Sequence, residues 1–151
     1  MAFKFTTGND IWLGGSGNDK IDALAGDDTL DGGAGNDILR GNKGKDHIAG
    51  GAGSDFLYGG DDDDTLDGGT ENDTLDGGAG NDIGYGGTGN DILYGGTGDD
   101  YLFGGNDADK LFGGAGSDVM DGGEGADTLY DTDNTTVYGL VSTEIDEMIG
   151  G

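Results

Sequence analysis

The chain has 151 residues, of which 38 are glycine and none is proline or cysteine. Its 32 acidic residues against 6 Lys and Arg give a net charge of −26, which argues against nucleic acid or an anionic membrane as partner. The lack of cysteine excludes a disulfide framework, and no apolar run is long enough to span a bilayer.

A nine-residue repeat begins after a short lead-in, residues 1–4, and continues without insertion over residues 5–130. The stretch Gly86 to Phe103, GGTGNDILYGGTGDDYLF, is one such phrase written twice. The repeat has fourteen units, and the sixth position is always aspartate. These aspartates are Asp10, Asp19, Asp28, Asp37, Asp46, Asp55, Asp64, Asp73, Asp82, Asp91, Asp100, Asp109, Asp118 and Asp127.

Each unit predicts one short strand and one turn. The eighth position is apolar in thirteen of the fourteen units, and the seventh and ninth positions are mixed, which indicates a three-residue half-buried strand. The other six residues are rich in glycine and predict a turn, because glycine tolerates positive φ and is unfavourable in a helix. Two strands and two turns make an 18-residue coil, so the chain predicts seven stacked coils with two parallel sheets as faces.

Stacking places the aspartates in two columns with like charges one coil apart, so we expect the fold to need a counter-ion. Carboxylates beside glycine turns, whose carbonyl groups can point inward, offer the all-oxygen ligand set that hard divalent cations prefer. Calcium fits better than magnesium because it accepts more ligands in a looser geometry. Sites between units n and n+2 would number 14 − 2 = 12, and twelve divalent ions would bring +24 against −26.

The units GGAGNDILR, GGTGNDILY and GGAGSDVMD resemble the GGxGxDxUx nonapeptide of the RTX (repeats-in-toxin) family. The resemblance implies an all-β, right-handed parallel β-roll that binds about 10–12 Ca²⁺ ions through the position-six aspartates and glycine carbonyls of adjacent coils. It also implies type I secretion and an extracellular or cell-surface location. The glycines expected as ligands are Gly33, Gly35, Gly51, Gly53, Gly78, Gly80, Gly87, Gly89, Gly96, Gly98, Gly114 and Gly116.

Some units depart from the pattern, which puts their turns in doubt. The fourth-position glycine is replaced by Asp62, Glu71 and Asp107, and the leading pair by Phe5-Thr6, Ala23-Leu24 and Gly41-Asn42. Lys43 and Lys45 flank Asp46 and are expected to weaken its site by repulsion. Gly84 leaves a gap in the core column that neighbouring leucines must fill.

The period breaks after residue 130. Thr136–Val141 predicts a last strand, and Glu144–Ile149 a capping helix or edge. Residues 131–151 are therefore interpreted as a cap or as the start of a further segment, and the sequence leaves both open.

No catalytic motif stands out from the repeat. His47 is the only histidine and is expected to point outward, and the GxGxxG match at Gly84–Gly89 is expected by chance in a chain so rich in glycine. We therefore expect no enzyme activity.

Aromatic residues at the ninth position predict outward-facing columns. Tyr94, Phe112 and Tyr130 should stack on one sheet, and Tyr85 and Phe103 on the other. The columns either stiffen the sheets or bind a partner, which could be a cell-surface or carbohydrate ligand or another copy.

The resulting functional hypothesis is a calcium-binding roll that folds outside the cell, aids type I secretion and serves as an extracellular scaffold. One alternative is an adhesion or carbohydrate-binding module. Another is a non-catalytic accessory module of a secreted protease, lipase or epimerase.

Overall fold

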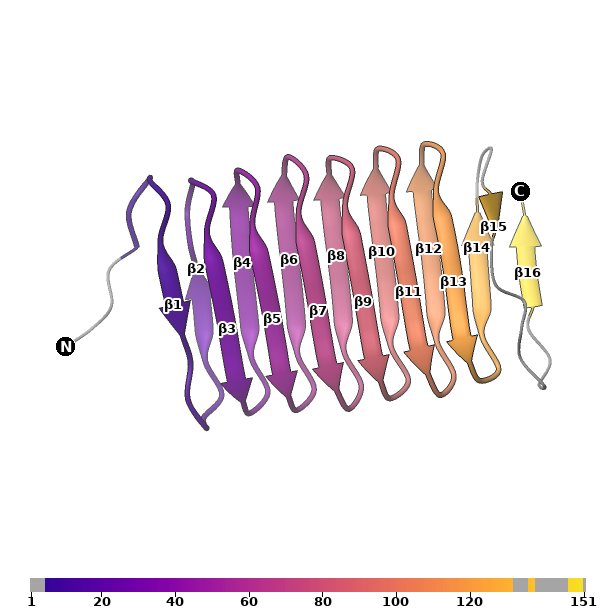
Figure 1. Cartoon of the computed structure of the whole chain (residues 1–151), viewed down its shortest axis with the longest axis horizontal. Helices are drawn as coiled ribbons and strands as arrows, with labels where there is room; N and C mark the ends of the chain where they lie inside the picture. Colours follow the sequence, from indigo (N-terminus) through magenta and orange to yellow (C-terminus); the bar gives the residue numbers. More distant parts are fainter. Residues whose placement is uncertain (1–4, 132–135, 138–146, 151) are drawn as a thin grey trace.

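The computed structural model describes residues 5–131, 136–137 and 147–150. All regular elements in these ranges are β-strands, and no helix occurs among them. The strands alternate between two eight-stranded sheets that form the two faces of a flattened coil (Figure 1). The all-β prediction is therefore confirmed for the described residues.

The odd-numbered strands form one sheet, called here the odd sheet. Its members are β1 (Ile11–Leu13), β3 (Thr29–Ala34), β5 (His47–Ala52), β7 (Thr65–Thr70), β9 (Ile83–Thr88), β11 (Tyr101–Asn106), β13 (Val119–Glu124) and β15 (Thr136–Val137). The even-numbered strands form the even sheet. Its members are β2 (Lys20–Asp22), β4 (Ile38–Lys43), β6 (Phe56–Asp61), β8 (Thr74–Ala79), β10 (Ile92–Thr97), β12 (Lys110–Ala115), β14 (Thr128–Asp131) and β16 (Glu147–Gly150).

Neighbouring strands in each sheet pair in parallel, with residues 18 apart in register through β14, as in Leu93 with Leu111. In Figure 1 the odd strands at the front run downward, and the even strands behind them run upward as the chain advances to the right. The coil is therefore right-handed. Seven coils span the repeat, as the 18-residue period predicts.

The strands are longer than the three residues predicted. Most have six residues, because the glycine pair that opens each unit continues the strand of the unit before it, as in β10, ILYGGT. Glycine lacks a Cβ, but its backbone still pairs, as Gly96 does with Gly114. The turns therefore shrink to the fourth, fifth and sixth positions of each unit.

The core is one column of side chains per sheet, and all its buried members except Ala23 come from the eighth positions. Leu93 and Leu111 are fully buried, and Leu102 is only 2% exposed. A Cβ built on Gly84 would lie 3.2 Å from Leu102 Cδ2 and 3.5 Å from Leu93 Cδ2. The neighbouring leucines therefore fill the gap, as predicted.

The strands after the repeat agree only in part with the sequence prediction. β15 covers the start of the strand predicted over Thr136–Val141, and β16 pairs with β14 as a strand at the end of the even sheet. Strand β16 fits the predicted edge rather than the capping helix over its residues. Residues 138–146 lie outside the described residues, so the rest of both predictions is not addressed.

Candidate metal centre

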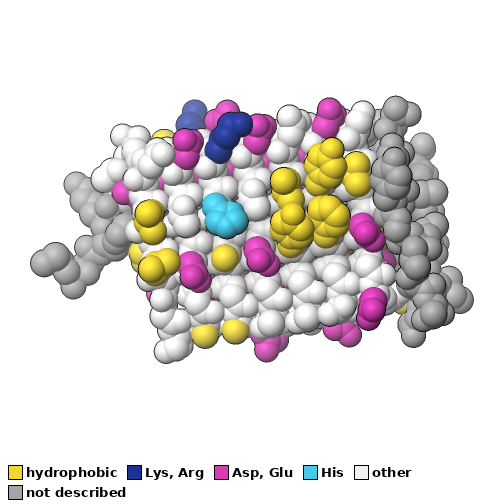
Figure 2. All heavy atoms as spheres, in the orientation of Figure 1, with side chains coloured by type: hydrophobic (Ala, Val, Ile, Leu, Met, Phe, Trp, Pro, Cys, Tyr) yellow, Lys and Arg dark blue, Asp and Glu magenta, His cyan; other side chains and the backbone are white. Residues whose placement is uncertain are grey.

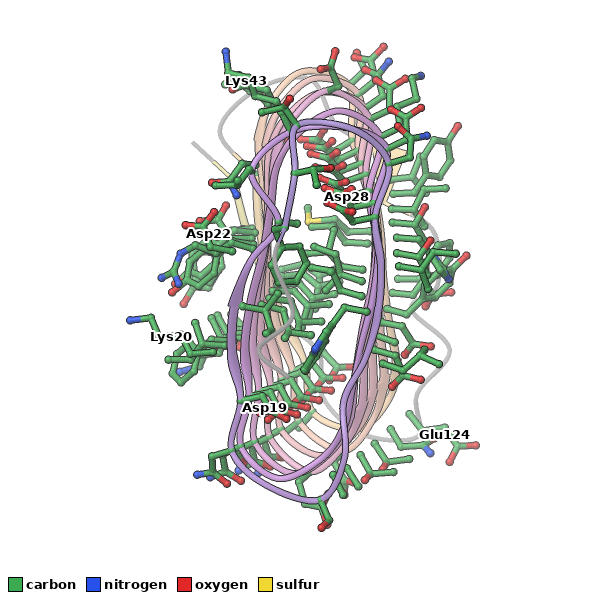
Figure 3. All side chains as sticks on the ribbon, turned by 90° about the vertical axis from the view of Figure 1, so that its left-hand side faces the viewer. Asp19, Lys20, Asp22, Asp28, Lys43 and Glu124 are labelled. Carbon is green, nitrogen blue, oxygen red and sulfur yellow. The ribbon has the colours of Figure 1, made fainter. Side chains whose placement is uncertain are left out.

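The position-six aspartates lie inside the roll at the two ends of its flattened cross-section. Figure 3, which looks along the coil axis, shows Asp28 near one rim and Asp19 near the other, each heading a column of carboxylates. From Asp28 to Asp127 these side chains are at most 3% exposed. The predicted columns are thus present, with aspartates 18 residues apart in adjacent coils.

One oxygen of each of these carboxylates has a defined partner. The backbone N–H of the aspartate one coil earlier donates to Oδ1, for example from Asp82 to Asp100 at 2.8 Å and from Asp91 to Asp109 at 2.7 Å. The same bond recurs from Asp10 to Asp28 at the first coil and from Asp109 to Asp127 at the last. Each aspartate therefore links two coils through its backbone and its side chain.

The second oxygen, Oδ2, is also buried but accepts no hydrogen bond within the described residues. This holds for Asp28, Asp37, Asp46, Asp55, Asp64, Asp73, Asp82, Asp91, Asp100 and Asp109. A buried oxygen without a hydrogen-bond partner costs about 1–3 kcal/mol of folding free energy, and an ionised one costs more. A repeated array of such oxygens indicates that a cation belongs beside them.

Glycine at the first position makes room for this oxygen. A Cβ built on Gly95 would collide with Oδ2 of Asp100 and with the carbonyl oxygen of Gly113 one coil further on. Gly77 stands in the same relation to Asp82. The Oδ2 atom thus points toward the Cα of the first-position glycine in its own unit, a role that the sequence analysis did not assign.

Burial raises the pKa of several carboxyl groups in the middle coils. The pKa of Asp64 rises to about 8, and those of Asp73, Asp100 and Asp109 rise to about 7. Desolvation is the largest cause, the backbone N–H bond to Oδ1 opposes it, and charge repulsion adds to it. A bound cation would remove this penalty by supplying the missing positive charge.

The glycines predicted as carbonyl ligands occupy the second and fourth positions and have positive φ, for example 112° at Gly96 and 127° at Gly98. A Cβ on Gly96 would collide with the carbonyl oxygen of Gly78, and a Cβ on Gly98 with that of Gly80. The carbonyl group of Gly78 therefore lies in strand β8, and that of Gly80 lies in the turn that follows, next to Asp82. Whether they bind the ion remains a prediction from the sequence.

The departures from the repeat do not break the turns. Leu24, Asn42, Asp62, Glu71 and Asp107 stand at second or fourth positions, and all adopt φ between 73° and 80°. These side chains accept the left-handed conformation that glycine adopts without strain. The backbone therefore follows the same path at these positions as at the glycines. The replacements affect the conformational energy of the chain there and not its course.

The lysines near Asp46 turn away from it. Lys43 lies 3.6 Å from Asp61, and Lys45 pairs with Asp63 one coil further on. In the acidic run from Asp61 to Asp64, only Asp64 is buried in the carboxylate column. The other three aspartates lie at the surface, where Asp61 and Asp63 pair with the lysines. These pairs were not predicted from the sequence, although each joins residues 18 apart.

A second ladder, at the fifth position, was also missed. There the side-chain oxygen accepts the backbone N–H one coil later, as from Asn90 to Asn72 at 2.8 Å and from Asp99 to Asn81 at 2.8 Å. This direction is opposite to that of the aspartate ladder. The recurrence of Asn or Asp before the invariant aspartate was the signal that could have revealed it.

The first coil differs from the others. Asp10 and Asp19 are only half-buried, and Oδ2 of Asp10 accepts hydrogen bonds from the backbone N–H of Thr6 at 2.7 Å and from Thr6 Oγ1 at 3.1 Å. Thr6 thus satisfies the oxygen that lacks a partner in the inner coils.

The site contains only oxygen donors of the kind that calcium prefers. No three acidic or imidazole side chains converge on one point among the described residues, so side chains alone cannot complete a coordination shell there. Backbone carbonyls remain the predicted source of further oxygen ligands. The fold and the site together define a calcium-binding parallel β-roll.

The family model described as RTX calcium-binding nonapeptide repeat (4 copies) matches residues 6–39, 31–66, 40–75, 58–93, 76–111 and 94–129. These overlapping matches cover nearly the whole repeat, so the chain belongs to the RTX calcium-binding repeat family and binds Ca²⁺ at multiple sites. A search of curated proteins finds no significant match.

Proposed function

We propose that this chain is a non-catalytic module that folds when calcium fills its carboxylate columns outside the cell. The observation that carries the proposal is the array of buried Oδ2 atoms without a partner in the described residues. In the cytosol, where calcium is scarce, the columns would stay charged and the chain unfolded. At extracellular calcium concentrations the ions would close the coils onto one another.

In this proposal each ion lies between the turns of adjacent coils on the same rim. Its ligands are Oδ2 of the position-six aspartates and the carbonyl oxygens at the second and fourth positions, including those of Gly78, Gly80, Gly96 and Gly98. Ten to twelve ions fit the number of turns. Asp10 contributes least, because Thr6 already satisfies its Oδ2.

Members of this repeat family are typically secreted, which supports an extracellular location and export by type I secretion. The calcium-dependent switch suits that route, since an unfolded chain crosses the export channel and the folded roll then forms outside. The described residues include no helix able to cross a bilayer. The folded roll would then serve as a rigid scaffold, with residues 5–130 as the roll and 131–151 as a cap or further segment.

The aromatic columns do not favour the carbohydrate-binding alternative. Tyr94 stacks on Phe112 with ring centroids 4.8 Å apart, Phe112 stacks on Tyr130 at 4.4 Å, and the planes are within 15° of parallel. The rings therefore cover one another's faces, which are the surfaces a sugar ring would need. The accessory-module alternative requires a parent enzyme chain and draws no support from the site.

The proposal is tested by titrating the EDTA-stripped chain with calcium and with magnesium while far-UV circular dichroism is recorded. We expect a cooperative coil-to-β transition with calcium alone, with roughly ten ions bound at saturation. A chain that is already folded in EDTA at neutral pH, or that ignores calcium, would overturn it.

A further inference from the structure

The odd sheet carries an exposed apolar cluster on its outer surface, called here the odd-face patch. It is formed by β9, β11 and β13, whose register places Tyr101 between Ile83 and Val119 and pairs Tyr85 with Phe103. Tyr85 is 42% exposed and Tyr101 is 49% exposed. Figure 2 shows the patch as the largest yellow cluster on this face, to the right of the single histidine.

The even sheet carries a matching cluster, called here the even-face patch, on β10, β12 and β14. It consists of Ile92 and the stacked rings of Tyr94, Phe112 and Tyr130. Tyr94 is 41% exposed. Strands β9 and β10 belong to one coil, as do β11 and β12, so the two patches lie back to back at the same place along the roll.

The two faces differ in charge over strands β1 to β14. Those of the odd sheet carry four acidic residues and no Lys or Arg. Those of the even sheet carry four cations and four aspartates. The acidic residues of the odd strands are Asp31, Asp67, Asp121 and Glu124, and the cations of the even strands are Lys20, Arg40, Lys43 and Lys110. Figure 3 shows Lys20 and Lys43 outside one sheet and Glu124 on the opposite side of the roll.

We propose that the partner of each face is a second copy of this chain, docked with its even face on the odd face of the first. Only this pairing sets the face that carries Lys and Arg beside its aspartates against the face whose charged strand residues are all acidic. Two odd faces would oppose acid to acid with no cation between them, and two even faces would leave both acidic faces uncovered. Charge complementarity of this kind selects the partner and its orientation.

The topology also supplies a register for this contact. If one copy is displaced sideways without rotation, each coil meets the same coil of its neighbour. The odd-face patch then lies on the even-face patch, and Asp31 of β3 lies beside the coil that carries Arg40 of β4. Because the two contacting faces differ, the contact does not close on itself, and it would build an open row of rolls.

Calcium would control this association through net charge. Copies that each carry −26 repel one another, whereas twelve bound ions would bring each copy to −26 + 24 = −2. A net charge near zero lets apolar patches associate. The inference goes beyond the proposed function and rests on it only in that the calcium-loaded roll is the state that associates.

The test is sedimentation velocity of the full chain in calcium over a range of concentrations, with dilute circular dichroism to verify that every variant folds with calcium. We expect oligomers that grow with concentration in calcium and only monomers in EDTA. Tyr101→Lys on the odd face and Tyr94→Asp on the even face should each weaken association at least tenfold. Ser16→Lys, at an exposed third position between β1 and β2 and distant along the roll from both patches, is the matched control and should associate like the original chain.

Mixing the two face variants gives the sharpest result. The intact odd face of the Tyr94→Asp chain can dock on the intact even face of the Tyr101→Lys chain, so the mixture should regain the association that each variant alone has lost. A folded chain that remains monomeric in calcium overturns the inference without touching the proposed function. Association lost with Tyr101→Lys but unchanged with Tyr94→Asp also overturns it, because it indicates an odd-on-odd dimer.

Discussion

At the scale of single residues, the two carboxylate oxygens of a position-six aspartate have different roles, one in stacking the coils and one in the proposed binding of the ion. Oδ1 of Asp100 accepts the backbone N–H of Asp82 and holds two coils in register. Oδ2 of Asp100 is buried without a hydrogen-bond partner and is the atom proposed to bind the ion. A substitution that changes the second oxygen alone can therefore separate metal binding from coil stacking.

Asp82→Asn makes this separation, because the amide keeps one oxygen to accept the bond from Asp64 and loses the charged ligand. We expect the calcium midpoint of folding to rise by a factor of about 1.3–1.7, since the loss of a charge-assisted contact, about 1.5–3 kcal/mol, is spread over about ten cooperatively bound ions. Calcium titration by circular dichroism measures the midpoint. Asp10→Asn is the matched control, and we expect a much smaller shift because Thr6 already bonds its Oδ2. Equal shifts in the two variants would contradict the proposed site.

Two glycine substitutions separate backbone conformation from core space. Gly96 has φ of 112° and its Cβ would collide with a backbone carbonyl oxygen, so Gly96→Ala should destabilise the calcium-loaded roll by about 2 kcal/mol or more. Gly84→Ala adds a methyl group against leucine side chains that can adjust, and we expect a change below about 1 kcal/mol. Urea unfolding in saturating calcium measures both. Similar losses in the two variants would show that the strand conformation at Gly96 is not constrained as described.

At the scale of elements, each strand depends on its neighbours in adjacent coils. The buried residues of β10 are only Leu93 and Gly95, so a single strand buries little apolar surface. Parallel pairing, the aspartate ladder and the fifth-position ladder join each coil to the next. Strands and sites are therefore expected to form together. The carboxylates of one column should then bind protons or calcium cooperatively.

The titration of these columns predicts opposite effects of pH with and without calcium. The pKa values of about 6 to 8 in the metal-free roll lie above the ordinary value for aspartate. Their stabilising contribution is complete below about pH 4 and is lost as pH rises through these values. Without calcium we therefore expect more β-structure at pH 5 than at pH 8, measured by circular dichroism in EDTA.

With calcium the direction reverses, because the ion competes with protons for the same oxygens. The calcium concentration needed for folding should rise as pH falls from 8 to 5. A calcium midpoint that does not change across this range would show that the raised-pKa carboxylates are not the ligands. The surface pair of Lys45 and Asp63 serves as an internal contrast, since the pKa of Asp63 is lowered and lies outside this window.

At the scale of the whole molecule, the roll is a linear array in which each coil contacts only the coils beside it. Stability in such arrays is roughly the sum of the coils and the contacts between them. The proposed twelve divalent ions nearly balance the net charge of −26, so the neutralisation of charge, like the fold, depends on the whole stack of coils.

Deletion of residues 68–85 removes two complete units and rejoins the chain in frame. We expect the shortened chain to keep a cooperative calcium transition and to bind about two fewer ions, because identical positions meet again at the junction. Calcium counting at saturation and circular dichroism test this. Loss of the transition would show that the coils are not interchangeable, contrary to a linear array.

The sequence by itself determined the period, the two parallel sheets, the leucine column and the two carboxylate columns, because an in-frame repeat places equivalent residues in contact at every coil. It also predicted the aromatic stacks, which follow from the same 18-residue spacing. The tertiary structure decided what depends on atomic directions. It extended the strands through glycine pairs such as Gly95 and Gly96, since backbone pairing needs no side chain. It also assigned separate roles to the two oxygens of Asp100, and among strands β1 to β14 it placed Lys and Arg, such as Lys110, on the even sheet only, because side-chain orientation is set by the closed coil.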